Sequence, residues 1–187
     1  MLTAGIQVVE RNTLGLATVL VRKGKGTELA ARVRERFGVE LPHEPRRVVA
    51  SATAPADMGA GANTNGGPGV IAFAGTAPGA WLALRQDAGA DFASCLAEHL
   101  AGLASVSDQS DGLSVLRISG PNVRDALCKI VPIDLHPREL IVNQVAATIV
   151  GHMPVTMWRL PDDADGTAIF EIATFRSCTA SFRYALG

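Results

Sequence analysis

Residues 108–121 read DQSDGLSVLRISGP, and this stretch decides the fold. The DQSDG run at 108–112 is rich in turn-forming residues and predicts the reversal of a hairpin. The next seven residues, 113–119, predict a β-strand. Gly120-Pro121 predicts the start of a helix, because a proline at the first helical position sacrifices no hydrogen bond. A hairpin strand that runs directly into a helix is typical of α+β proteins.

The same alternation of strands and helices extends outward from this stretch in both directions. Gly38 and Gly102 mark helix ends, and Pro78-Gly79 marks a tight reversal. The pattern predicts strands at 14–22, 70–74, 80–85, 103–107, 113–119, 145–150, 155–160 and 168–173, and helices at 28–36, 91–101, from 121, and 175–186. The order predicts an α+β fold of two related split-βαβ halves, with antiparallel or mixed sheets and helices packed on them.

A chain of 187 residues has the length of one domain, and we expect a single domain over residues 1–187. One segment differs in composition from the rest. Residues 51–69 are rich in alanine and glycine and carry a single charged residue, Asp57. Such a segment buries too little apolar surface to offset its chain entropy, so we expect a flexible loop there.

Charge, apolar runs and cysteine spacing indicate which partners and which cellular compartment to expect. The net charge is −1, which argues against a nucleic-acid surface. The N-terminal residues lack the basic and apolar regions of a signal peptide, and no apolar run approaches the ~20 residues that span a bilayer. Three widely spaced cysteines, Cys95, Cys128 and Cys178, predict free thiols rather than a disulfide framework. We therefore expect a cytoplasmic protein.

The sequence predicts no catalytic, cofactor-binding or metal-binding residue. It contains no zinc-ligand spacing, no phosphate-binding glycine loop and no nucleophile elbow. Asp134 and His136 could form an oriented base, but Pro132 and Pro137 bracket them, and local turn hydrogen bonds explain them better. Asp108 and Asp111 could in principle act as paired carboxylates, although turn chemistry accounts for them as well.

Trp158 and Arg159 form the remaining suggestive pair, at the end of a predicted strand. They could bind a ligand by stacking and charge, or Trp158 could simply be a core residue. Tryptophan and arginine are also the residues that concentrate binding energy at protein contacts. We therefore assign Asp134, His136, Trp158 and Arg159 as candidate interface residues.

Several segments taken together resemble the gamma subunits of heterotetrameric sarcosine oxidases. They are the 108–121 stretch itself, Asp-Leu-His-Pro at 134–137, the Gly-His-Met turn at 151–153, the 155–160 strand with its Trp-Arg pair, and Arg-Ser at 176–177. Trp-Leu-Ala-Leu at 81–84 and the stretch 34–42 match the same pattern. The resemblance covers nearly the whole chain, although the 51–69 loop looks longer than in the family and the last helix ends early.

The resemblance implies a fold like the folate-binding module of the glycine-cleavage aminomethyltransferase. It also implies a structural subunit of an enzyme that oxidatively N-demethylates a secondary amine and passes the one-carbon unit to tetrahydrofolate. Its partners would be alpha, beta and delta subunits, which are expected to hold FAD, FMN, NAD, tetrahydrofolate and zinc. A free-standing folate-binding one-carbon module is the alternative, and a folded domain without ligand or partner is a third possibility.

Overall fold

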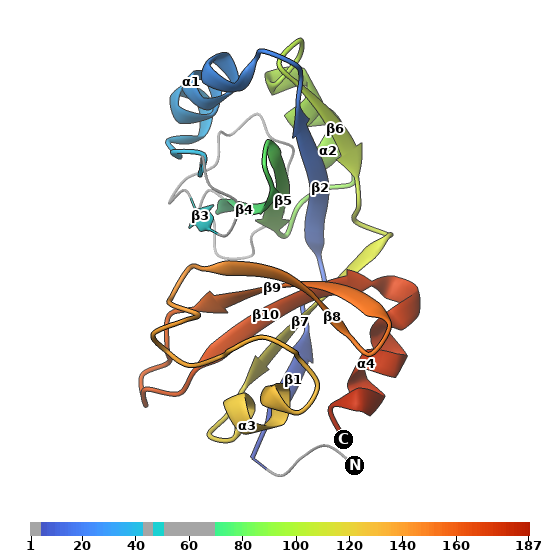
Figure 1. Cartoon of the computed structure of the whole chain (residues 1–187). Helices are drawn as coiled ribbons and strands as arrows, with labels where there is room; N and C mark the ends of the chain where they lie inside the picture. Colours follow the sequence, from blue (N-terminus) through green and yellow to red (C-terminus); the bar gives the residue numbers. More distant parts are fainter. Residues whose placement is uncertain (1–4, 43–46, 51–69) are drawn as a thin grey trace. The chain divides into compact units, whose positions relative to one another are not determined.

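The computed structural model describes residues 5–42, 47–50 and 70–187 (Figure 1). These residues fall into two compact units. The first comprises residues 13–110 of the chain. The second combines the N-terminal residues up to Asn12 with residues 111–187. The single domain that the sequence predicts over 1–187 stays a prediction, and the loop expected at 51–69 lies outside the described residues.

The unit of residues 13–110 is a five-stranded sheet with two helices. Its strands lie in the order β3-β4-β5-β2-β6, and all its strand pairs are antiparallel. The elements are β2 (Leu14–Val21), α1 (Gly26–Phe37), β3 (Val48–Ala50), β4 (Ile71–Ala77), β5 (Ala80–Gln86), α2 (Phe92–His99) and β6 (Ala104–Asp108).

The second unit is built from both ends of the chain. Its sheet has the order β1-β7-β10-β9-β8 and is antiparallel throughout. The elements are β1 (Gln7–Glu10), β7 (Leu113–Ser119), α3 (Val123–Cys128), β8 (Val145–Val150), β9 (Met153–Leu160), β10 (Ile169–Phe175), the 3₁₀ turn η1 (Arg176–Cys178) and α4 (Thr179–Ala185).

The two sheets share one topology. In each unit, a first strand (β2 or β7) leads to a helix and then to a meander of three strands. The last strand of the meander (β5 or β10) pairs with that first strand, and a second helix follows. On its other side, this first strand pairs with a strand that comes from a different part of the chain in each unit. In the 13–110 unit it is β6, which follows α2 in sequence, whereas in the other unit it is β1, which comes from the N-terminus. The N-terminal strand therefore completes the C-terminal half.

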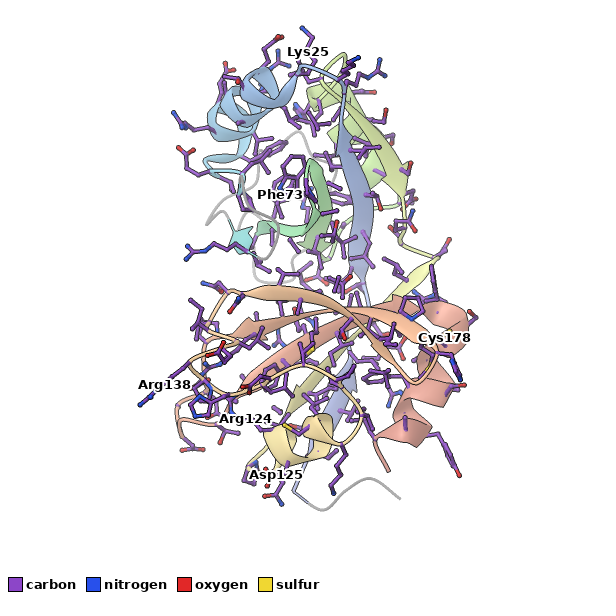
Figure 2. The ribbon with its side chains drawn as sticks, viewed as in Figure 1. Lys25, Phe73, Arg124, Asp125, Arg138 and Cys178 are labelled. Carbon is purple, nitrogen blue, oxygen red and sulfur yellow. The ribbon has the colours of Figure 1, made fainter. Side chains whose placement is uncertain are left out.

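Each unit buries its own apolar core between helices and sheet. In the 13–110 unit, Leu29, Val33 and Phe37 form the buried face of α1, and the ring of Phe37 lies 5.8 Å from that of Phe73 (Figure 2). Gly38 ends this helix with φ 64°, a left-handed conformation that glycine adopts without strain. In the other unit, β7, β9 and β10 pack Ile118, Met157, Phe170 and further apolar side chains against α3 and α4.

The structure confirms the α+β fold, with antiparallel pairing in every described strand pair. The sequence missed β1 and β3, and it placed two helices too broadly. The hairpin predicted across 108–112 is wrong, because β6 pairs with β2 in one sheet and β7 pairs with β1 and β10 in the other. The helix expected from 121 is Val123–Cys128. The helix expected at 175–186 begins only after the strand residue Phe175 and the turn η1. Within the described ranges, no helix combines the length and the apolar character needed to cross a bilayer.

Candidate functional site

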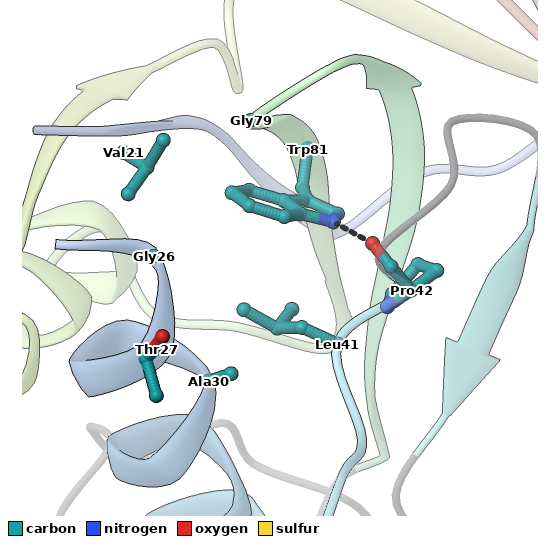
Figure 3. A pocket seen from close by; sticks show the side chains of 8 residues that line it. All are labelled: Val21, Gly26, Thr27, Ala30, Leu41, Pro42, Gly79 and Trp81. Atoms are coloured by element: carbon teal, nitrogen blue, oxygen red, sulfur yellow. Dashed lines mark hydrogen bonds between the residues drawn. The ribbon is translucent and has the colours of Figure 1, made fainter. Parts of the chain in front are cut away.

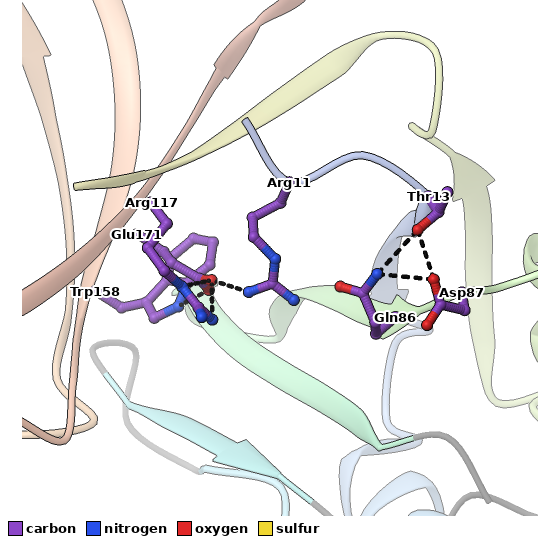
Figure 4. Close-up of polar contacts among 7 residues, drawn as sticks. All are labelled: Arg11, Thr13, Gln86, Asp87, Arg117, Trp158 and Glu171. Carbon is purple, nitrogen blue, oxygen red and sulfur yellow. Dashed lines mark hydrogen bonds and ion pairs between the residues drawn. The ribbon is translucent and has the colours of Figure 1, made fainter. Parts of the chain in front are cut away.

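A buried carboxylate organises the sheet face opposite α3 and α4. Glu171, in the middle of β10, is 6% exposed. Its Oε1 accepts hydrogen bonds from Arg117 Nε at 3.0 Å and Nη2 at 2.7 Å, and also pairs with Arg11 (Figure 4). Its Oε2 accepts the indole N–H of Trp158 at 3.0 Å. Both carboxylate oxygens are engaged within the chain, so Glu171 links β7, β9 and β10 with Arg11, the residue that follows β1.

Trp158 and Arg159, two of the four candidate interface residues, lie in the interior. Trp158 is 2% exposed and Arg159 is 6% exposed. Adjacent residues of a strand point to opposite faces, so Trp158 faces Glu171 and Arg159 faces the helix side. Arg159 Nη2 binds the Asp162 carboxylate at 2.8 and 3.0 Å, and Nη1 donates to the Leu140 carbonyl at 3.4 Å. Both side chains are thus committed to contacts within the chain.

Asp134 and His136, the other two candidate interface residues, lie in an exposed loop between α3 and β8. Asp134 Oδ1 accepts the backbone N–H of His136 at 2.7 Å, and His136 Nδ1 accepts that of Arg138 at 3.3 Å. The Asp134 carboxylate therefore accepts a turn hydrogen bond from the backbone, as the sequence interpretation favoured. The His136 imidazole accepts a similar bond from the backbone two residues further on. Neither bond is the carboxylate–imidazole contact that an oriented base needs.

Two arginines fix this loop from the side of the core. Arg124, on α3, donates to the carbonyl of Leu135, and its guanidinium lies 5.4 Å above the ring of Phe170 (Figure 2). Burial and, next to it, the positive charge of Arg159 lower the pKa of Arg124. Arg159 reaches the Leu140 carbonyl at the other end of the loop. The loop that carries Asp134 and His136 is therefore held at two carbonyls, those of Leu135 and Leu140.

Asp108 and Asp111, the other two acidic residues that the sequence singled out, each make a hydrogen bond of their own. Asp108 Oδ1 accepts both the backbone N–H of Ser110 at 2.9 Å and its hydroxyl at 2.7 Å. These two bonds lower the pKa of Asp108, which favours the ionised form. The backbone carbonyl of Asp111 accepts from Arg176 at 3.0 Å. Asp108 therefore serves the turn, as the turn interpretation expected, whereas Asp111 contributes its backbone carbonyl.

A hydrogen-bonded triad at one sheet end of the 13–110 unit went unnoticed in the sequence. Thr13 Oγ1 donates to Asp87 Oδ1 at 2.6 Å, and Gln86 Nε2 donates to the same two oxygens at 2.9 Å each (Figure 4). Thr13 has φ 64° and Asp87 φ 52°, so two non-glycine residues hold the left-handed conformation side by side. The bonds between their side chains stabilise these two turns.

A cavity of about 260 Å³ opens beside α1 in the same unit (Figure 3). Trp81 forms one wall and donates its indole N–H to the Pro42 carbonyl at 3.3 Å. The remaining lining is largely apolar and comes from Val21, Gly26, Thr27, Ala30, Leu41 and Gly79. With the indole N–H satisfied, the cavity offers shape and apolar contact rather than charge. Within the described residues, no group of three or more His, Cys, Asp or Glu side chains could hold a metal ion.

Comparison with known proteins identifies relatives in sequence and in fold. No protein-family model matches the chain. The chain is 32% identical over 158 residues to the sarcosine oxidase subunit gamma of an Arthrobacter species, covering 84% of this chain and 69% of that protein. It is 33% identical over 162 residues to the subunit of the same name from Corynebacterium sp. strain P-1, with the same coverage.

Two solved structures share the fold. A chain of the heterotetrameric sarcosine oxidase from Corynebacterium sp. U-96 superimposes with a TM-score of 0.74 at 24% identity, covering 99% of this chain and 85% of that one. The glycine cleavage system aminomethyltransferase T from Bartonella henselae superimposes with a TM-score of 0.63 at 15% identity, covering 98% of this chain and 45% of that one. These likenesses confirm the expected aminomethyltransferase-like fold.

Proposed function

This chain belongs to the family of sarcosine oxidase gamma subunits, and we propose that it is a non-catalytic structural subunit of a heterotetrameric, flavin-dependent sarcosine oxidase-like enzyme. The observation that carries the proposal is the 32% identity over 158 residues to a named gamma subunit. The complex would oxidatively N-demethylate a secondary amine and pass the one-carbon unit to tetrahydrofolate. We place it in the cytoplasm.

In this proposal the chemistry lies in the other subunits. Alpha, beta and delta subunits would hold FAD, FMN, NAD, tetrahydrofolate and zinc, and this chain would support their assembly. The side-chain contacts agree with such a role. Asp108 and the Asp134–His136 turn, which were among the most suggestive polar groups of the sequence, both form turn hydrogen bonds within the folded chain.

The loop around Asp134 and His136 is our candidate for a contact with a partner subunit. It is exposed, and it leads into Ile141 and Val142, which are 44% and 38% exposed. Exposed apolar side chains beside polar ones are typical of protein contacts. Trp158 is buried and donates its indole N–H to Glu171, so it does not belong to this contact surface. Arg159 is also buried, and in this proposal it supports the contact indirectly, because it holds the Leu140 end of the loop.

Co-purification tests the proposal directly. A tagged copy of the chain, expressed in its native host, should bring down flavin-containing partners in a fixed ratio, identified by mass spectrometry. The isolated chain should show neither a flavin absorbance spectrum nor bound zinc. Isolation of the tagged chain alone, or with stoichiometric flavin of its own, would overturn the proposal.

The fold likeness to aminomethyltransferase T favours one alternative, a free-standing folate-binding one-carbon module. Fold alone does not transfer a function. Titration of the isolated chain with a stable reduced folate in a calorimeter separates the two. Stoichiometric binding without any partner supports the folate module, and binding only in the assembled complex supports the subunit.

A further inference from the structure

Arg124, on α3, presents part of its guanidinium group to solvent in a fixed orientation. Its Nη1 donates to the Leu135 carbonyl, and its Cζ lies 5.4 Å from the centroid of the Phe170 ring (Figure 2). These two contacts restrain an otherwise flexible side chain. Within the residues that the structure describes, Nε and Nη2 have no hydrogen-bond partner, and neither atom is fully buried. The Nε–Nη2 edge of the guanidinium is therefore open and held in place.

The positive charges around this edge exceed the negative ones. Arg159 acts on Arg124 as a nearby like charge and Asp162 as a nearby opposite charge, and burial together with Arg159 lowers the pKa of Arg124. The Asp162 carboxylate is already bound by Arg159 Nη2, at 2.8 and 3.0 Å. Two guanidinium groups thus share this carboxylate. A partly buried charge without a counterpart is unfavourable, so the pair of arginines favours a further anion.

Arg159 shows independently that the polar groups of this region are not all satisfied. The residue is 6% exposed, and its Nε is buried without a hydrogen-bond partner among the described residues. Its Nη1 reaches the Leu140 carbonyl only at 3.4 Å. Buried donors without an acceptor are rare in folded proteins, because they cost free energy. An anion bound at Arg124 would also stabilise the charge of Arg159 through the field that already couples the two side chains.

We propose that Arg124 binds a carboxylate side chain of a partner subunit, as a bidentate pair through Nε and Nη2. This inference rests on the proposed function. The fork of an arginine matches the two oxygens of a carboxylate. One negative charge balances the two arginines and Asp162, whereas a phosphate group, with a charge of about −1.5 to −2, would exceed that balance. The ligand is therefore an aspartate or glutamate rather than a phosphate.

The loop next to Arg124 favours a protein carboxylate over a small free one. Arg124 and Arg159 hold this loop at the carbonyls of Leu135 and Leu140, and the next two residues, 141 and 142, carry exposed apolar side chains. A charged pair that apolar contacts shield from water is typical of strong protein contacts. A partner polypeptide can supply both the carboxylate and the apolar cover. A small carboxylate supplies the charge alone.

Arg124→Lys tests the pair while it keeps the positive charge. Lysine can still donate to the Leu135 carbonyl, but it has no bidentate edge. The matched control is Lys129→Gln, which removes a positive charge from the exposed residue at the end of the same helix. Both variants are made in the full chain and co-expressed with the partner genes. We expect Arg124→Lys to lower partner recovery at least about tenfold, and Lys129→Gln to leave it unchanged.

The outcomes separate the carboxylate site from the proposed function. Equal partner recovery with the parent chain and with Arg124→Lys would overturn the site while the subunit function stands. No partner with the parent chain would instead overturn the function itself. Equal losses in Arg124→Lys and Lys129→Gln would show a general effect of charge and overturn the specific pair. Calorimetric titration of the free chain with sodium acetate covers the other source. Binding below about 1 mM that Arg124→Lys abolishes would assign the site to a free carboxylate and overturn the partner assignment.

Two direct measurements locate the carboxylate. A water-soluble carbodiimide joins an amine to a carboxylate in direct contact, so in the complex the amine introduced by Arg124→Lys should be linked to an aspartate or glutamate of a partner, identified by mass spectrometry. A link to Asp162 alone would overturn the proposal. In the parent chain, the Nε–H of Arg124 should exchange with water at least about tenfold more slowly in the complex than in the free chain, measured by NMR. Unchanged exchange on assembly would overturn the proposal even if Arg124→Lys does not fold.

Discussion

Trp158 and Glu171 lie directly opposite each other on β9 and β10, and the indole N–H of Trp158 donates to the Glu171 carboxylate at 3.0 Å. Both side chains are buried, and a buried indole N–H and a buried carboxylate each need a partner. Arg117 and Arg11 occupy the other carboxylate oxygen. The Trp158–Glu171 bond is thus the centre of a polar cluster that joins β7, β9 and β10 with Arg11, the residue after β1.

Glu171→Gln should therefore destabilise the chain. The amide still accepts from Trp158, but it no longer balances the guanidinium groups of Arg11 and Arg117, which are partly buried. We expect a loss of about 2 kcal/mol in the free energy of unfolding, measured in urea; this is below the 3–5 kcal/mol typical of fully buried pairs. The control is Glu40→Gln, since Glu40 pairs with Arg34 in solvent. It should cost under about 0.5 kcal/mol. Equal losses in the two variants would contradict the role of Glu171.

Arg159→Ala should lower the stability of the free chain by about 2–3 kcal/mol, because Asp162 and the Leu140 carbonyl lose a buried donor. From the sequence alone, the same substitution is expected to weaken assembly and leave the melting temperature nearly unchanged. Urea unfolding of the free chain and the association constant with partners decide between the two. Arg138→Ala, in the exposed loop, is the control for stability. A stable Arg159→Ala chain with impaired assembly would restore Arg159 to the interface itself.

The turn at Asp108 should add a pH-dependent contribution to stability. The pKa of Asp108 is lowered in the folded chain by the two bonds from Ser110. A carboxyl whose pKa is lower in the folded state stabilises the fold above its unfolded pKa of about 3.9, and this contribution disappears as the pH falls through the folded pKa. Asp108→Asn should therefore be less stable than the parent at pH 7, with a difference that shrinks below about pH 4. A difference in unfolding free energy that stays constant from pH 7 to pH 3 would show that ionisation plays no part.

Gly120 should resist substitution far more than Gly102. Gly120 has φ 119°, and a Cβ there would lie 2.4 Å from the carbonyl oxygen of Gly5. Gly102 has φ 76° and open space around it. Gly102→Ala should cost about 1 kcal/mol for the left-handed conformation alone. Gly120→Ala should cost at least about 2 kcal/mol more, because Gly5 must move away. Thermal melts of the two variants compare the losses in stability, and similar losses would show that the backbone at Gly5 moves away at no cost.

Local signals sufficed for most elements of the fold. Apolar spacing located α1, and the turn residues at 151–152 located the β8–β9 hairpin. The residues at 108–112 located a turn but not the predicted hairpin, because β6 and β7 belong to different sheets. The missed strand β1 carries no such signal, since its four residues pair with β7, more than a hundred residues away. β3 is only three residues long. Short strands that depend on distant partners are specified by tertiary contacts, which a local pattern does not contain.

The polar contacts show the same difference between local contacts, which the sequence predicts, and contacts between distant residues, which it does not. The Asp134 and Asp108 turns form bonds over two residues, and turn chemistry predicted them. The Glu171 cluster brings together residues of three strands, β7, β9 and β10, with Arg11 near the N-terminal end, and sequence spacing did not reveal it. One signal was present: Glu171 is a single charge within the apolar run AIFEIA at 168–173. A charge within a central strand indicates a buried partner, because an unpaired buried carboxylate is costly.

The position of β1 also bears on how the chain folds as the ribosome makes it. The 13–110 unit has all its strands once residue 110 has left the ribosome, and domains generally fold as units from the N-terminal side. β1 is made first, yet its partner β7 arrives only after that unit is complete, and β8 to β10 come later still. A strand that stays unpaired while more than a hundred further residues are synthesised can pair with a non-native strand. β1, which precedes the 13–110 unit in the chain, is therefore among the last strands to be placed, and nascent chains should be most prone to misassociation while residues 111–175 are being translated.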